Sequence, residues 1–169
     1  MLTPPANLIQ GKLVLYPSEI LRFTCNEVLS FDGMLHHLVN DLALELIKHR
    51  ALGIAAPQIG APYRVFLFLY QDQIHHVVNP TLKVGDGMEA GYEACLSVPR
   101  MAGMVMRHKR AYLSGMNMHG RPVEYDLTGL EARVVQHEYD HLDGILFIDK
   151  MVPGTVRTMR NGGTDAQVL

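Results

Sequence analysis

The sequence predicts an α+β fold in which mixed, mainly antiparallel β-sheets pack around a central C-terminal helix, with a second helix near the N-terminus. Two observations lead to this prediction. Residues 33–50 and 128–144 carry apolar side chains at helical spacing, and the sequence between them consists of short apolar segments separated by turn residues. Because the strands are grouped rather than alternating with helices, the pattern favours antiparallel sheets over a βαβ repeat.

The composition indicates one globular domain, which we expect to span residues 1–169. The chain is 48% hydrophobic and 19% charged, as is usual for globular proteins, and it is long enough to bury a core. The polar, glycine-rich end at residues 153–169 is expected to fray. The net charge of −2 and the lack of a Lys/Arg-rich run predict that no nucleic acid is bound directly.

The sequence also suggests where the protein works. The apolar segment at 65–70 is too short to span a bilayer, and residues 1–13 do not have the pattern of a secretory signal, so no membrane partner is expected. The only cysteines are Cys25 and Cys95, which form no spacing motif. This usage suits a reducing compartment, and we expect a cytoplasmic protein.

The predicted elements follow in chain order. A first helix begins after Asp32 and is closed by Gly53. Strands are then expected at 63–70 and 74–80, joined by a polar turn, with short strands near 81–84 and 103–108. Residues 110–118 and 121–127 flank His119-Gly120, which is typical of a tight hairpin.

The second helix carries the most informative motif, "QHEYDHLDG". Thr128 and Glu131 predict a capping box at its start, and Gly144 predicts a left-handed residue after its end. At about 100° per residue, one stripe of the helix faces the core, with Glu138 at its edge. The residues of this stripe are Leu130, Val134, His137 and His141.

His137 and His141, with Glu138 between them, form an H-E-x-x-H sequence, which is typical of a metal site. The alternative is a core helix whose histidines are hydrogen-bonded internally. If a metal is bound, a metzincin would need a third histidine where Phe147 stands, and a thermolysin-like enzyme would need a later glutamate, of which there is none after Glu138. Asp143 lies on the wrong side of the helix.

Other ligands remain open at this point. Asp149 and Asp165 are not excluded by their spacing, but Cys95, in the short segment "EACLSVP", offers a stronger ligand as a thiolate. Cys25 is its rival, and could equally be a small buried apolar residue. Cys95 with two histidines would leave a fourth position open for water, the arrangement of a catalytic site.

The segment "LGIAAPQIG" at 52–60 has two interpretations. It could be a plain helix-to-strand loop, for which glycine, alanine and proline are ordinary residues. It could also let the backbone approach a ligand closely, with Gln58 as an amide donor to an oxyanion.

Taken together, "ALGIAAPQIG", "EACLS" and "QHEYDHLDG" resemble, in order, the three motifs of the peptide deformylase family. The likeness extends from about residues 16–22 to residues 144–150, which is most of the chain. It implies a metal-dependent hydrolase that removes the formyl group from N-formyl-methionine at the start of newly made polypeptides and releases formate. These nascent peptides, at the ribosome, would be its partners, and the enzyme is expected to be a monomer or weak homodimer.

The resemblance also implies roles for individual residues. Cys95, His137 and His141 match the ligands of one divalent metal ion, Fe²⁺ in the family, with Zn²⁺, Ni²⁺ or Co²⁺ able to replace it. Glu138 matches the general acid/base. Two oxyanion donors are matched by the Gln58 side chain and the backbone N–H of Leu96, and the backbone of Gly53 matches a contact to the substrate peptide.

The substrate pocket is less clearly marked. Ile54, Leu130 and Val134 could line an apolar pocket for the methionine side chain, or could simply be core. Ala94 replaces a family glycine where the backbone would contact the peptide. Ala51 replaces another glycine, and Ala102 stands where many bacterial members have arginine. These departures concern substrate binding, not the metal ligands.

Three further interpretations stay open. Asp140 could orient the helix or a ligand through a neighbouring group, or could be a solvated surface charge. A metalloprotease would need a His, Glu or Asp ligand after His141. A non-catalytic protein of the same fold could bind polypeptide N-termini, although pure binding would not require Glu138 and Gln58.

Overall fold

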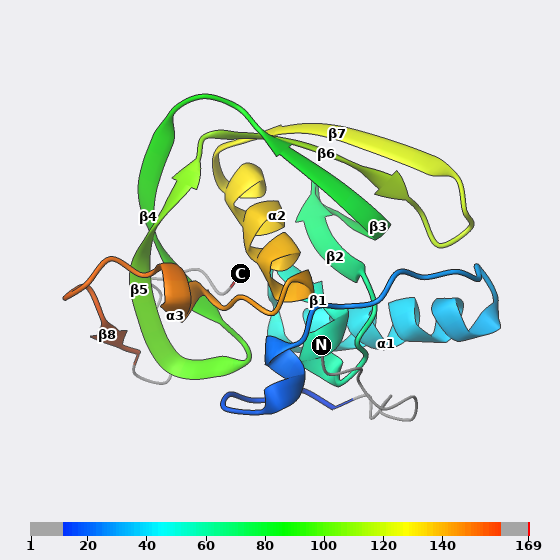
Figure 1. Ribbon diagram of the computed structural model, residues 1–169, viewed down its shortest axis with the longest axis horizontal. Helices are drawn as coiled ribbons and strands as arrows, with labels where there is room; N and C mark the ends of the chain where they lie inside the picture. The colour runs from blue at the N-terminus through cyan, green and yellow to red at the C-terminus, as the bar shows by residue number, and fades with distance from the viewer. Residues whose placement is uncertain (1–11, 160–168) are drawn as a thin grey trace.

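The computed structural model describes residues 12–159 and Leu169. Two antiparallel sheets and three α-helices make up this part of the chain, with α2 in the middle (Figure 1). The helices are α1 (Gly33–His49), α2 (Gly129–Leu142) and the short α3 (Phe147–Lys150). Two 3₁₀ turns, η1 (Glu19–Arg22) and η2 (Ala56–Ile59), complete the helical elements of the described residues.

The larger sheet has the order β1-β2-β3-β6-β7 and the smaller one the order β4-β5-β8, with antiparallel pairing throughout. The fold class predicted from the sequence is therefore confirmed. The strands are β1 (Gly53–Ala55), β2 (Val65–Tyr70), β3 (Gln73–Val84), β4 (Met88–Cys95), β5 (Val98–His108), β6 (Arg110–Met116), β7 (Pro122–Thr128) and β8 (Arg157–Thr158).

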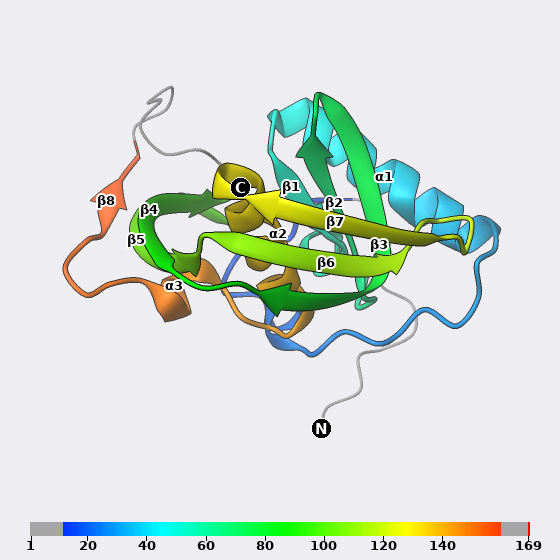
Figure 2. The same cartoon turned by 90° about the horizontal axis from the view of Figure 1, so that it is seen from above.

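Helix α2 lies between the β4–β5 hairpin on one side and β1 and β2 on the other, as both views show (Figures 1 and 2). One buried cluster surrounds α2 and includes Phe66, Phe68 and Val134. A second cluster lies between α1 and the opposite face of β1 and β2, because successive side chains of a strand point to opposite faces. The sheets thus hold α2 on two sides, so its histidine face can meet residues of both.

Several predicted boundaries are wrong, for identifiable reasons. The two strands expected at 74–80 and 81–84 are one strand, β3, with an irregularity between Val78 and Thr81. The segment 52–60 is neither a plain loop nor only a close backbone approach, since it forms β1 and η2, and their residues are fully buried. Helix α1 ends at His49 with Arg50 in the left-handed region (φ 52°), before Gly53.

Capping of the helices was predicted in part. Asp32 caps α1 by accepting hydrogen bonds from the backbone N–H groups of Met34 and Leu35. The capping box expected at Thr128 is not formed, because the Thr128 side chain makes no capping hydrogen bond. Gly144 has the expected left-handed conformation (φ 72°), and a Cβ at this position would lie 2.4 Å from the Arg22 carbonyl oxygen.

The structure describes only part of the glycine-rich end of the chain, residues 153–159 and Leu169. Residues 160–168 lie outside the described residues, so the expected fraying is not assessed there. However, Arg157 and Thr158 pair with β5, and Leu169 is 1% exposed within the cluster around α2. In the described part of the chain, no helix has both the length and the apolar character needed to cross a membrane.

Candidate metal centre and active site

Two elements bring the predicted metal ligands together. Helix α2 places His137 and His141 one turn apart on the same face, and Cys95 stands at the end of β4. One ligand atom from each of the three residues lies within 4.8 Å of the others, and all three side chains are buried. The Cys95 Sγ is 3.3 Å from the His141 Nε2. The rival Cys25 is buried in the cluster around α2, outside this group.

The donor set fits a divalent metal ion. The His137 Nε2 atom is fully buried, yet no described residue pairs with it. Burial lowers the pKa of His141 well below 6.5, so this imidazole stays neutral and keeps a lone pair for a ligand. Burial, and then the charge of Glu138, raise the pKa of the Cys95 thiol, and a bound cation would offset that cost. A thiolate with two neutral imidazoles suits Zn²⁺ or Fe²⁺.

Glu138 lies beside the metal ligands with neither carboxylate oxygen paired to any part of the chain that the structure describes. The side chain is fully buried, which is costly for a carboxylate without a partner. Burial, followed by repulsion from Glu93, raises the pKa of Glu138 well above 4.5. Gly53 makes room for it, because a Cβ on Gly53 would lie 2.5 Å from the Glu138 Oε1. An unpaired carboxyl with a raised pKa in a buried site can accept and return a proton.

The Gln58 amide has its orientation set by the backbone of its own turn. Its Oε1 accepts a hydrogen bond from the Ala55 N–H at 2.8 Å, so its NH₂ group faces the metal ligands. The Gln58 Nε2 lies 3.5 Å from the Cys95 Sγ and 3.3 Å from the Ser97 Oγ. Leu96 follows Cys95 directly, between β4 and β5. Gln58 therefore directs its N–H donors toward Cys95, and donors held in this way can stabilise a negative charge.

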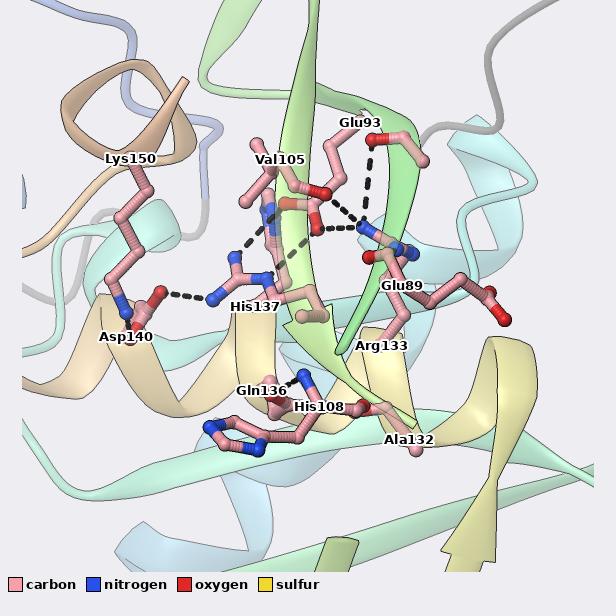
Figure 3. A network of polar contacts seen from close by, with 12 residues as sticks. Glu89, Glu93, Val105, His108, Ala132, Arg133, Gln136, His137, Asp140 and Lys150 are labelled. Atoms are coloured by element: carbon pink, nitrogen blue, oxygen red, sulfur yellow. Dashed lines mark hydrogen bonds and ion pairs between the residues drawn. The ribbon is translucent and has the colours of Figure 1, made fainter. Parts of the chain in front are cut away.

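A buried network of charged residues supports the metal ligands (Figure 3). The Glu93 carboxylate accepts hydrogen bonds from the His137 Nδ1 at 2.9 Å, from Arg107 at 2.9 Å and from Arg133 at 2.9 Å. Burial alone would raise the pKa of Glu93, but the bonds from His137 and Arg107 outweigh it, so the pKa lies well below 4.5. Glu93 is thus a buried carboxylate with its charge fully paired.

Asp140 extends this network. Its carboxylate pairs with Arg107 at 2.6 Å and with Lys150 at 2.7 Å, and the residue is 8% exposed. The interpretation of Asp140 as a solvated surface charge is therefore wrong. Asp140 is linked to His137 through Arg107 and Glu93. This agrees with the other interpretation, in which Asp140 orients a ligand through a neighbouring group.

Sequence reasoning missed Glu93, Arg107 and Arg133, although spacings pointed to Glu93 and Arg133. Glu93 stands two residues before Cys95, so both side chains leave β4 on the same face. Arg133 stands four residues before His137, on the same face of α2. Arg107 lies on β5 opposite Glu89, five residue pairs along the β4–β5 hairpin from Ala94. No pattern near it in the sequence indicates its role.

The structure divides the residues that were candidates for the substrate pocket. Val134 is buried in the cluster around α2, whereas Leu130 is 38% exposed at the start of the helix. Ile54 belongs to the cluster on the α1 side of β1, and so it is not brought together with Val134. Ala94 is 2% exposed, and its carbonyl oxygen accepts a hydrogen bond from the Leu169 N–H at 3.0 Å.

The aspartates that a protease would need as a third ligand are used elsewhere. Asp143 pairs with Arg64, and Asp149 pairs with Arg22 and caps the turn at Leu146. Asp165 lies outside the described residues. Phe147, at the position of a metzincin histidine, stacks on the His137 ring.

An α+β fold with a buried Cys-His-His group, an unpaired carboxyl and an oriented amide defines a metal-dependent hydrolase. The comparisons with known proteins agree with this class. The family model described as polypeptide deformylase matches residues 11–156. This chain belongs to the polypeptide deformylase family, and the enzyme class predicted from its sequence motifs, a peptide deformylase, is confirmed.

Individual relatives show how far the similarity extends. A peptide deformylase of Acidothermus cellulolyticus is 41% identical over 82% of this chain and 77% of its own. The crystal structure of a peptide deformylase from Thermotoga maritima superposes with a TM-score of 0.81 at 32% identity, covering 84% of this chain and 97% of that one. That of Synechococcus elongatus, in complex with actinonin, gives a TM-score of 0.82 at 27% identity, covering 90% of this chain and 84% of that one.

Proposed function

We propose that this single domain removes the formyl group from N-formyl-methionyl peptides with one divalent metal ion held by Cys95, His137 and His141. The observation that carries the proposal is the buried His137 Nε2, which lies beside the other two ligands and has no partner among residues 12–159 and Leu169. When bound, the ion would act as a Lewis acid toward water and toward the formyl oxygen. Fe²⁺ is our choice for the native ion, and Zn²⁺, Ni²⁺ or Co²⁺ would replace it.

The chain's own residues perform the remaining steps. Glu138 takes the proton of the attacking water and delivers it to the departing amine, for which its buried position and raised pKa are suited. The Gln58 amide, with the backbone N–H of Leu96, stabilises the negative charge that develops on the formyl oxygen. The backbones of Gly53 and Ala94 hold the peptide, and Val134 lines the pocket for the methionine side chain, with Leu130 at its rim.

The test is an assay of the metal-loaded protein under anaerobic conditions. Protein loaded with Fe²⁺ or Co²⁺ releases formate from an N-formyl-methionyl tripeptide. Glu138→Ala keeps its metal but loses about 10²–10⁴-fold in turnover, the usual contribution of such proton transfer. Glu131→Ala, a partly exposed residue on the same helix, is the matched control and retains full activity. Bound metal without any formate release would refute the proposal.

The two cysteines allow a separate test of the metal ligands. With Co²⁺, the wild type shows thiolate-to-metal charge-transfer absorption, which Cys95→Ser loses and Cys25→Ser keeps. Cys25 lies outside the group formed by Cys95, His137 and His141, so its thiol does not substitute as a ligand. A metalloprotease with an Asp ligand would keep its metal in Cys95→Ser.

We also propose where and with which partners the enzyme acts. Both cysteines are free, which suits the cytoplasm, where formylated nascent peptides leave the ribosome. We expect a monomer or a weak homodimer.

A further inference from the structure

Leu169 lies in a position that its place in the sequence does not explain. The residue follows a polar, glycine-rich stretch, yet its side chain is 1% exposed. It belongs to the buried cluster around α2, together with Ala132 and Val134. Val134 lies on α2 three residues before His137, so this cluster extends along the helix that carries the two histidines.

The backbone of Leu169 makes a second contact beside the same site. Its N–H donates to the Ala94 carbonyl oxygen at 3.0 Å, and Ala94 directly precedes the metal ligand Cys95. Among the strands that the structure describes, β4 is at the edge of its sheet, with β5 as its neighbour on the other side. An edge strand offers free backbone groups to which an extended peptide can add, while a pocket receives the peptide's side chain.

The Ala94 carbonyl oxygen and the cluster that contains Val134 are also the places assigned above to the substrate. A formyl-methionyl peptide that reaches the metal ligands must pass along β4 at Ala94 and place an apolar side chain near Val134. Leucine and methionine have similar volumes and replace each other in apolar pockets at small cost. Leu169 therefore presents to the site what the substrate presents, an apolar side chain and a backbone N–H.

We propose that Leu169 occupies the substrate's methionine position and competes with the substrate, so that the enzyme carries a built-in inhibitor. This inference rests on the proposed function, because it takes the site near Val134 and Ala94 as the place where the peptide binds. Since the competitor is part of the same chain, its effective concentration at the site is high even if the contact itself is weak. Substrate then binds only to the fraction of molecules from which Leu169 has withdrawn.

The kinetic test compares Leu169→Ala and Leu169→Asp with the wild type, all loaded with the same metal. Both variants lower the KM for an N-formyl-methionyl tripeptide and leave kcat unchanged. The decrease is roughly tenfold if the site is free a tenth of the time in the wild type. Leu169→Met keeps the contact and the wild-type KM. Leu29→Ala, which changes a leucine that is 91% exposed, is the control and also keeps it. An unchanged KM in both Leu169→Ala and Leu169→Asp would overturn the proposal.

A binding measurement on the wild type needs no activity and no variant. In Zn²⁺-loaded, ¹⁵N-labelled protein, the Leu169 amide exchanges slowly with solvent because it is bonded to Ala94. Saturating methionyl tripeptide, the product of the reaction, displaces it and speeds its exchange. If the peptide displaces Leu169 but the metal-loaded wild type releases no formate in the assay above, the proposed function fails, whereas the competition between Leu169 and the peptide stands. If formate is released while the peptide leaves Leu169 protected, the competition fails and the function stands.

Discussion

The His137 Nδ1 donates a hydrogen bond to the Glu93 carboxylate at 2.9 Å. Because the pKa of Glu93 is lowered, this carboxylate is ionised and can only accept, which assigns the ring proton of His137 to Nδ1. The lone pair is then on Nε2, the atom that faces Cys95 and His141 without a partner among the described residues. Glu93 thus holds the His137 ring in the orientation that leaves Nε2 available as a ligand atom.

Glu93→Gln therefore weakens metal binding. The variant keeps the size of the side chain but loses the charge that orients His137, and such outer partners usually contribute 10–100-fold in metal affinity. Competition with a chelator measures the affinity, and the absorption of the Co²⁺ form reports the changed ligand geometry. Glu89→Gln, an exposed glutamate on the same strand, leaves both unchanged. Equal affinities of the two variants would contradict the role of Glu93.

The substitution Gln58→Glu distinguishes the two functions of the Gln58 amide, whose oxygen accepts a hydrogen bond and whose NH₂ group donates. The carboxylate still accepts the hydrogen bond from the Ala55 N–H, but it has no donor to offer to the substrate. Loss of one oxyanion donor typically lowers kcat by about 10²–10³. Steady-state kinetics on the Co²⁺ form measures this loss, with Gln71→Glu in the exposed β2–β3 turn as a control. A kcat within a few-fold of the wild type would exclude Gln58 as an oxyanion donor.

The substitution Gly53→Ala is expected to displace the Glu138 carboxyl, although it leaves Glu138 itself unchanged. The added Cβ would lie 2.5 Å from the Glu138 Oε1, so the carboxyl must move. We expect kcat to fall while metal content stays complete, since the three atoms nearest to this Cβ all belong to Glu138 and none to a metal ligand. Gly33→Ala is the matched control because nothing lies within 4 Å of its added Cβ. If both variants have wild-type kcat, Glu138 tolerates displacement and the packing at Gly53 has no catalytic consequence.

Arg107→Met tests what the buried charges contribute to stability. Arg107 is 3% exposed and pairs with both Glu93 and Asp140, so its removal leaves buried carboxylates without their main partner. Breaking a buried pair in this way costs about 3–5 kcal/mol of unfolding free energy. Urea denaturation measures the change. Arg110→Met, which breaks an exposed pair with Asp126, changes the stability little. Similar urea midpoints for the two variants would contradict the expectation that the buried ion pairs stabilise the fold more than the exposed pair does.

Much of the fold could be predicted from the sequence because its signals are local. The helical spacing of 33–50 and 128–144 and the His119-Gly120 turn depend on residues that are near one another in the chain. Strand β1 could not be predicted, because three consecutive buried residues show no alternation. The placement of Ile54 away from Val134 depends on which face of β1 meets α2, and that relation is set only by the tertiary structure.

The residues of the candidate site also fall into those that the sequence indicates and those that only the tertiary structure brings together. The two histidines and Glu138 follow from one turn of a helix, and Cys95 and Gln58 were found through motifs. Arg107 and Leu169 are functional candidates only because β5 and the end of the described chain come back to α2. No pattern near either residue indicates such a contact.

In the proposed metal centre, helix α2 and the β4–β5 hairpin both contribute ligands, and this has a thermodynamic consequence. Cys95 belongs to the smaller sheet and the histidines to the helix, so an ion bound by all three links two parts of the fold that unfolding would separate. A ligand that binds only the folded state stabilises it by about 2.7 kcal/mol at a free concentration one hundred times its dissociation constant. The melting temperature of this protein therefore depends on the free metal concentration, so metal supply determines both how active the enzyme is and how much of it stays folded.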